Sequence, residues 1–168
     1  GAAGARSRAK GAPKRQPIPA GDAALLRRDA AVPGDLIAVT GPLGSSAGGL
    51  RALALGISSP DTDVLKMAHF RPQPRVREGV MLVKGGVRAA MDISDGLVAD
   101  LEKMAGMSKA GARIILDKVP VDPALVRAFP DEWRELALGG GEDYELVFTC
   151  PAVFAPELVE AIRRATGT

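Results

Sequence analysis

The sequence has few of the residues that several classes of functional site require. It contains one cysteine, Cys150, and one histidine, His69, so neither an internal disulfide nor a Cys/His metal cluster can form within it. Aromatic residues make up only 4% of the chain, which argues against a surface that stacks nucleic-acid bases. No apolar run approaches the roughly 20 residues of a membrane-spanning helix. We therefore expect a globular protein of a reducing compartment, placed in the cytoplasm with no membrane partner, and interpret His69 as structural.

Acidic residues are missing from the first twenty positions, although the whole chain has a net charge of only +2. This segment is also rich in Gly, Ala and Pro, a composition that cannot build a core. Its five basic residues are Arg6, Arg8, Lys10, Lys14 and Arg15. We predict a flexible basic arm over residues 1–24 and one domain over residues 25–168. A solvated tail is the favoured interpretation of the arm, and contact with nucleic acid is the weaker alternative.

The remainder has the composition of a protein with one sizeable core, since 46% of the chain is hydrophobic and 25% is charged. Short apolar segments alternate with segments of helical periodicity. Strands are expected over residues 36–40, 87–90, 113–116 and 144–150. This order predicts an α/β fold, bordering on α+β, with a mixed sheet covered by helices and parallel neighbours joined by helices. The last helix should bury Phe154, Leu158 and Ile162 on one face.

A strand that turns sharply into a helix is the most informative stretch of the sequence. Asp92 and Asp95 lie at this turn, with Ser94 between them and Gly96 behind. The junction of a strand and a helix is a common place for phosphate or metal in α/β proteins. The alternative is that Ser94 or Asp95 only caps the helix. A Gly/Ser turn over residues 44–49 could also hold phosphate, but it lacks the lysine of a P-loop.

A second acidic turn follows three consecutive glycines near the end of the chain. Glu142 and Asp143 come directly after residues 139–141 and before an apolar strand. Glycines let a backbone approach a ligand closely, although Gly-Gly beside acids also occurs in ordinary loops. Four carboxylates at one rim of a sheet would suit a divalent metal or a cationic substrate.

The two acidic turns together resemble motifs of the thiamine-monophosphate kinase family. The motifs are Met-Asp-Ile-Ser-Asp-Gly-Leu-Val-Ala-Asp-Leu over residues 91–101 and Gly-Gly-Glu-Asp-Tyr-Glu-Leu-Val-Phe-Thr over residues 140–149. Residues 33–44 resemble the family's entry to its carboxy-terminal domain. Residues 71–76, followed by Gly79, resemble its proline-flanked arginine segment. The wider superfamily of proteins like aminoimidazole-ribonucleotide synthetase shares the fold that this resemblance implies.

The resemblance implies a kinase that transfers the γ-phosphoryl group of ATP to thiamine monophosphate, giving thiamine diphosphate with the help of Mg²⁺. Asp92 and Asp95 match the family's Mg²⁺ ligands, and Ser94 matches a residue that contacts ATP phosphate. Glu142 matches a residue that contacts the thiamine moiety. Asp143 and Tyr144 are assigned structural support, and no catalytic side chain is assigned. The full-length family member is expected to be a homodimer.

The chain departs from the family in lacking a counterpart of the amino-terminal nucleotide-binding domain and of the extreme carboxy terminus. We therefore expect an incomplete part of the enzyme, with little or no kinase activity on its own. One alternative is another enzyme of the same superfamily, acting on an aminoimidazole-type nucleotide or a selenium or hydrogenase-maturation substrate. The other is a solitary, non-catalytic domain that binds a phosphorylated metabolite or a protein partner.

Overall fold

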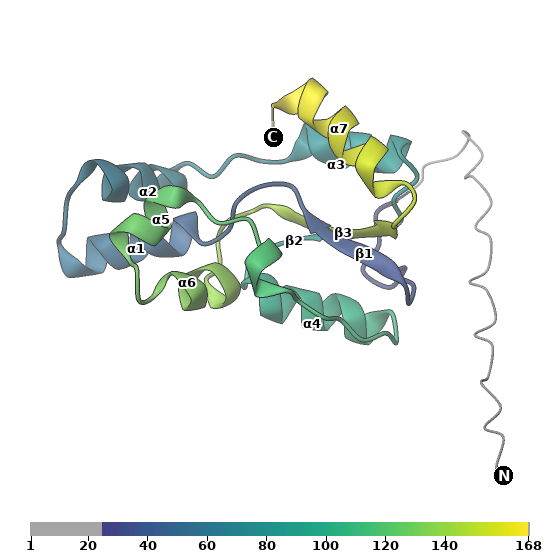
Figure 1. Cartoon of the computed structure of the whole chain (residues 1–168), viewed down its shortest axis with the longest axis horizontal. Coiled ribbons are helices and arrows are strands. Elements are labelled where there is room, and N and C mark those ends of the chain that lie inside the picture. The colour runs from purple at the N-terminus through teal and green to yellow at the C-terminus, as the bar shows by residue number, and fades with distance from the viewer. Residues whose placement is uncertain (1–24, 168) are drawn as a thin grey trace, which may run out of the picture.

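Three antiparallel strands form the centre of the protein in a computed structural model, which describes residues 25–167 (Figure 1). The strands are β1 (Asp35–Val39), β2 (Ala89–Asp92) and β3 (Leu146–Pro151). Their order in the sheet is β1-β3-β2, so the last strand in sequence lies between the other two. Strand β2 therefore ends, with Asp92, opposite the beginning of β3.

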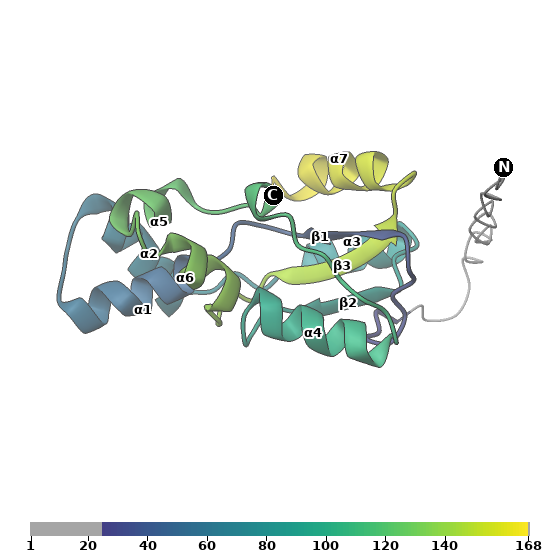
Figure 2. The same cartoon turned by 60° about the horizontal axis from the view of Figure 1, so that its bottom comes forward.

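Different helices cover the two faces of the sheet (Figures 1 and 2). Helix α4 (Leu97–Met107) packs on one face, whereas α3 (Val76–Lys84) and α7 (Ala155–Thr166) pack on the other. Successive residues of a strand point to opposite faces, so Val147 belongs to the core on the α4 side and Phe148 to the core on the other side. The apolar character of β3 follows from this burial on both faces.

Four helices form a separate group beyond one end of the sheet (Figure 2). They are α1 (Ser45–Leu55), α2 (Pro60–Phe70), α5 (Pro123–Ala128) and α6 (Trp133–Gly139). Leu65 and Leu125 are fully buried among them, and Trp133 is partly buried against the same cluster. A Cβ atom on Gly49 would lie 2.2 Å from the backbone oxygen of Leu65, so α1 and α2 can approach this closely only with glycine there.

The α/β class and the helix-covered sheet are confirmed, but the expected parallel neighbours are wrong. All three strands pair antiparallel, and in the described part of the chain the sheet gains a parallel neighbour only through an isolated bridge between Arg27 and Ala89. The prediction of a strand over residues 113–116 is also wrong, because no described strand pairs with this segment. A short 3₁₀ helix, η1 (Leu116–Lys118), begins there instead.

Two further expectations concern the ends of the chain. Leu158 and Ile162 are buried as predicted, but Phe154 precedes α7 and is 51% exposed. The predicted basic arm, residues 1–24, lies outside the described residues, so its separation from the domain stays a prediction. Within residues 25–167, none of the helices is both long enough and apolar enough to cross a membrane.

Candidate functional site

The two acidic turns lie side by side and are joined through their backbones. The N–H of Ile93 donates to the carbonyl of Glu145 at 2.7 Å, and the N–H of Tyr144 donates to Ile93 at 3.0 Å. The N–H of Glu142 then donates to the carbonyl of Ser94, also at 3.0 Å. These bonds continue the β2–β3 pairing beyond Asp92, and they bring Ser94 and Glu142 to the same end of the sheet.

Glycine is required where the turns touch. A Cβ atom on Gly141 would lie 2.3 Å from the backbone oxygen of Ser94, which is closer than any real contact. Gly96 has a φ of 109°, and a Cβ there would lie 2.7 Å from the backbone oxygen of Gly139. The glycines of both motifs therefore allow the two acidic turns to meet.

Asp100 fixes the first turn from inside the protein. Its side chain is fully buried, and one carboxylate oxygen accepts the N–H groups of Ser94 and Asp95, each at 2.9 Å. Burial acts to raise the pKa of Asp100, but hydrogen bonds from Lys103 and from the two N–H groups outweigh it, and the pKa is lowered. No role for Asp100 was predicted from the sequence. The sequence feature that could have indicated this role is a carboxylate in the first turn of the predicted helix, where backbone N–H groups have no helical partner and can donate to it.

The three predicted residues of this turn remain accessible. The side chain of Asp92 is 45% exposed, and the guanidinium of Arg28 lies 3.9 Å from its carboxylate. Asp95 is 63% exposed and pairs with Lys103, which also contacts Asp100. The Ser94 hydroxyl makes no hydrogen bond to any other described residue. The turn therefore offers two carboxylates and a hydroxyl to a ligand.

The second turn holds Glu142 in a strained but accessible position. Glu142 and Tyr144 have φ values of 68° and 52°, a left-handed conformation that is costly for residues other than glycine. The hydroxyl of Tyr144 donates to Glu142 at 2.9 Å, and this hydrogen bond raises the pKa of Tyr144. The phenol therefore orients the carboxylate of Glu142, which is consistent with structural support from Tyr144.

The carboxylate of Asp143 caps the amino-terminal end of α1. Its carboxylate accepts the N–H groups of Gly44 at 2.6 Å and of Ser46 at 3.1 Å. These amides belong to the Gly/Ser turn considered above for phosphate, so a carboxylate of the chain already uses them. Burial raises the pKa of Asp143 to about 6, although the two N–H groups act to lower it.

This raised pKa predicts a pH-dependent stability. The folded pKa of about 6 exceeds the unfolded value of about 3.9, so the contribution of Asp143 is full below pH 4 and is lost as the pH rises through 6. Because Asp143→Asn cannot ionise there, the stability of the wild type relative to this variant should fall by about 2 kcal/mol between pH 4 and pH 7. Urea unfolding at both pH values measures the difference. Asp117→Asn, at an exposed site in η1, is the control, and a constant difference for Asp143→Asn would contradict the prediction.

The four carboxylates of the two turns do not form a cluster of metal ligands in the described part of the chain. No group of three or more His, Cys, Asp or Glu side chains in residues 25–167 is arranged to hold a metal ion. Asp92 and Asp95 can supply two oxygen ligands, whereas Mg²⁺ takes about six. Two carboxylates therefore fit only part of a Mg²⁺ site.

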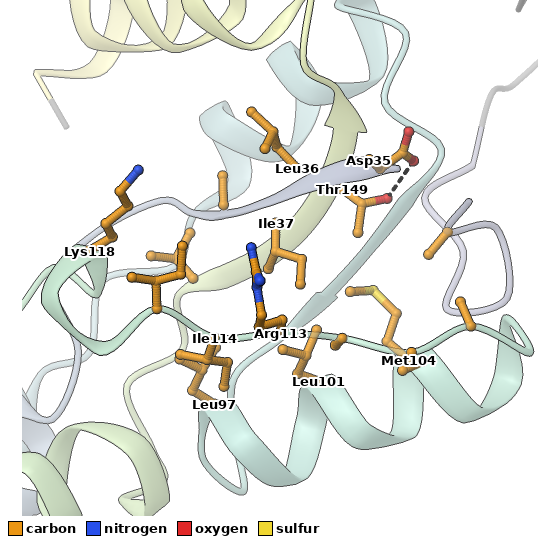
Figure 3. Close-up of a pocket in the computed structure, with 18 of the residues that line it drawn as sticks. Asp35, Leu36, Ile37, Leu97, Leu101, Met104, Arg113, Ile114, Lys118 and Thr149 are labelled. Atoms are coloured by element: carbon orange, nitrogen blue, oxygen red, sulfur yellow. Dashed lines mark hydrogen bonds between the residues drawn. The ribbon is translucent and has the colours of Figure 1, made fainter. Parts of the chain in front are cut away.

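Two cavities lie near these elements, and one of them adjoins the second turn. A cavity of about 360 Å³ is lined by Ser46, Ala47, Leu50, Arg51, Ala54, His69, Leu136, Gly140, Gly141 and Glu142. A larger cavity of about 640 Å³ runs between β1 and α4, where Ile37, Leu101 and Met104 face it (Figure 3). None of the four predicted site residues lines the larger cavity. The smaller cavity is lined by one of them, Glu142.

A buried ion pair behind the second turn was missed by sequence analysis. The guanidinium of Arg75 donates to both carboxylate oxygens of Glu145, at 2.8 and 2.5 Å. The hydroxyl of Thr40 donates to the same carboxylate at 2.5 Å, and Glu78 lies 3.6 Å from Arg75. The hydrogen bond to Glu145 raises the pKa of Arg75. Both partners lie within the motifs quoted above, but they are 70 residues apart, so the sequence alone does not indicate that they are in contact.

The fold and the paired turns define a known class of domain. The family described as "AIR synthase related protein, C-terminal domain" matches residues 32–167, and the chain belongs to this family.

Several of its relatives are thiamine-monophosphate kinases. The thiamine-monophosphate kinase of Salmonella typhimurium is 45% identical over 138 residues, which are 80% of this chain and 42% of that protein. The crystal structure of the thiamine-monophosphate kinase from Stenotrophomonas maltophilia matches with a TM-score of 0.77 and 38% identity, covering 83% of this chain and 46% of that one. A complex of AaThiL with AMPPCP and TMP matches with a TM-score of 0.72 and 36% identity, over 77% and 43%. The chain thus spans less than half the length of the relatives it matches.

Proposed function

We propose that this chain is the carboxy-terminal part of an ATP-dependent kinase that phosphorylates thiamine monophosphate to thiamine diphosphate. The observation that carries the proposal is the backbone pairing of the two acidic turns, which brings Ser94 and Glu142 to one end of the sheet. The similarity to thiamine-monophosphate kinases and to a complex with AMPPCP and TMP supports it. Enzymes catalyse phosphoryl transfer mostly by positioning the two substrates and by neutralising charge on the phosphate oxygens. Two neighbouring turns with exposed polar side chains suit both tasks.

The proposed roles follow from the exposed groups of the two turns. Asp92 and Asp95 bind Mg²⁺, which when bound neutralises charge on the phosphate oxygens. The Ser94 hydroxyl donates to a phosphate oxygen of ATP. Glu142, oriented by Tyr144, faces the cationic thiamine ring system, where opposite charges attract. Asp100 holds the backbone of the first turn while these contacts form.

The proposal extends to the setting in which the whole enzyme works. We place the enzyme in the cytoplasm, as a homodimer that uses Mg²⁺, with thiamine monophosphate and ATP as its small-molecule partners. Neither a membrane nor a nucleic acid is part of this proposal. The chain spans less than half the length of the kinases it matches, so the chain alone should show little or no turnover.

A chimera tests the proposal directly. The chain would replace the matching 138 residues of the Salmonella typhimurium kinase, and a coupled ADP-release assay would follow turnover with thiamine monophosphate, ATP and Mg²⁺. The chimera should be active and the chain alone inactive. Asp92→Asn and Asp95→Asn should each lower kcat at least about tenfold, whereas Asp117→Asn, the same chemical change outside both turns, should not. A folded but inactive chimera, or robust turnover by the chain alone, would contradict the proposal.

A further inference from the structure

Lys103 places a positive charge directly beside the first acidic turn. It lies in the second turn of α4, and its side chain reaches back to Asp95, which precedes the helix. Its ammonium group donates to Asp100 at 2.9 Å and also donates to Asp95. An ammonium group has three N–H groups, and no other residue in the range 25–167 accepts a hydrogen bond from this one. One donor of Lys103 is therefore left for a ligand.

The two carboxylates that contact Lys103 differ in how firmly they hold it. The side chain of Asp100 is fully buried and lies on the same face of α4, three residues before Lys103. If the ammonium left, a buried carboxylate oxygen would lose its partner, so Lys103 stays anchored at Asp100. Asp95 is 63% exposed, and its pair with Lys103 lies in contact with water. A ligand at this turn can thus share Asp95 while the ammonium keeps its place.

The anchored ammonium changes which ligands Asp95 attracts. Asp95, Asp100 and Lys103 together carry one net negative charge, whereas the two carboxylates alone would carry two. A free divalent cation at Asp95 is therefore attracted less strongly, and it also lies close to a like charge. A divalent cation that is bound to a nucleotide brings phosphate oxygens with it, and one of these can accept the remaining N–H of Lys103 as a charge-assisted hydrogen bond.

We propose that Lys103 selects a metal–nucleotide complex over the free metal at the first acidic turn. It repels a free divalent cation from Asp95, and it donates to a phosphate oxygen of the nucleotide when the metal arrives as a complex. The inference rests on the proposed function, in which Asp95 binds Mg²⁺ and Ser94 contacts ATP phosphate. Lys103 is then a specificity-determining residue that was not predicted from the sequence.

Neutral substitutions of Lys103 should change two dissociation constants in opposite directions. Lys103→Met removes the charge, and Lys103→Gln removes it but keeps an N–H group that can donate to Asp100. For either variant of the chain, the dissociation constant of Mn²⁺ alone should fall at least about threefold. The dissociation constant of ATP with Mg²⁺ should rise about tenfold, because one charge-assisted hydrogen bond is lost. Electron paramagnetic resonance of the free ion measures Mn²⁺ binding, and calorimetry measures the binding of ATP with Mg²⁺.

Matched controls separate the charge at this position from other effects of the substitutions. Lys103→Arg keeps the charge, so both constants should stay within about threefold of the wild type. Lys109→Met makes the same chemical change beyond the carboxy-terminal end of α4 and should leave both constants unchanged. Thiamine monophosphate without metal should bind the wild type and Lys103→Met alike, because Lys103 is assigned to the phosphate of the nucleotide. Circular dichroism checks that each variant is folded.

Only opposite changes in the two dissociation constants support the inference. Unchanged constants, or changes in the same direction, would show that Lys103 has no role or a merely structural one, and they would overturn it. A loss of affinity for thiamine monophosphate rather than for ATP would also overturn it, as would a wild-type chain that does not bind ATP with Mg²⁺. The chimera decides the proposed function separately. An active chimera leaves that function in place after any of these results, whereas a folded but inactive chimera overturns it whatever the Lys103 variants bind.

Discussion

Replacing Arg75 with alanine is expected to lower the free energy of unfolding by about 3–5 kcal/mol. Arg75 donates to both oxygens of Glu145, whose side chain is only 7% exposed. Without the guanidinium, this carboxylate keeps the hydroxyl of Thr40 as a partner but remains charged in a poorly solvated place. Urea unfolding followed by circular dichroism measures the loss.

Two variants separate the buried pair from the general effect of losing an arginine. Arg127→Ala breaks an exposed pair with Asp61, and because water screens that pair, its loss should change stability little. Adding Glu145→Gln to Arg75→Ala removes the uncompensated charge, so the double variant should be more stable than Arg75→Ala alone. If the double variant gains nothing, an unpaired carboxylate is not the cause of the loss.

Replacing Asp100 with alanine is expected to cost about 3 kcal/mol and to loosen the first acidic turn. The carboxylate is the acceptor for the N–H groups of Ser94 and Asp95 and a partner of Lys103. Because the pKa of Asp100 is lowered, its stabilisation is complete above about pH 4 and is lost as the pH falls through the folded value. Urea unfolding at pH 7 measures the stability, and hydrogen exchange measures the turn.

Asp122→Ala is the matched control, because Asp122 also accepts a backbone N–H, that of Ala124 at 2.7 Å, but at the start of α5. Its loss should cost about 1 kcal/mol, a usual value for a helix cap, and should leave the first acidic turn unchanged. Amide exchange at Ser94 and Asp95 should accelerate in Asp100→Ala and not in Asp122→Ala. Unchanged exchange in Asp100→Ala would show that the turn does not depend on this carboxylate.

Local patterns predicted the elements that depend on local interactions. The helix expected after the first acidic turn begins at Leu97 and ends at Met107, as the spacing of its apolar residues indicated. The segment over residues 113–116 has equally suitable residues for a strand but does not form one, since a strand needs a partner and none of those described pairs with it. The prediction of parallel neighbouring strands was wrong for a similar reason, because strand pairing joins segments that are far apart in the sequence.

The candidate site divides in the same way. The sequence by itself determined the two motifs, the family resemblance and the residues Asp92, Ser94, Asp95 and Glu142, because these follow from residue types at fixed short spacings. Only the tertiary structure decided that Asp143 caps α1 and that Asp100 holds the first turn. It also decided that Ser46 orients His69. The direction in which a side chain points, and the partner that it meets, depend on packing between distant segments, which spacing along the chain does not specify.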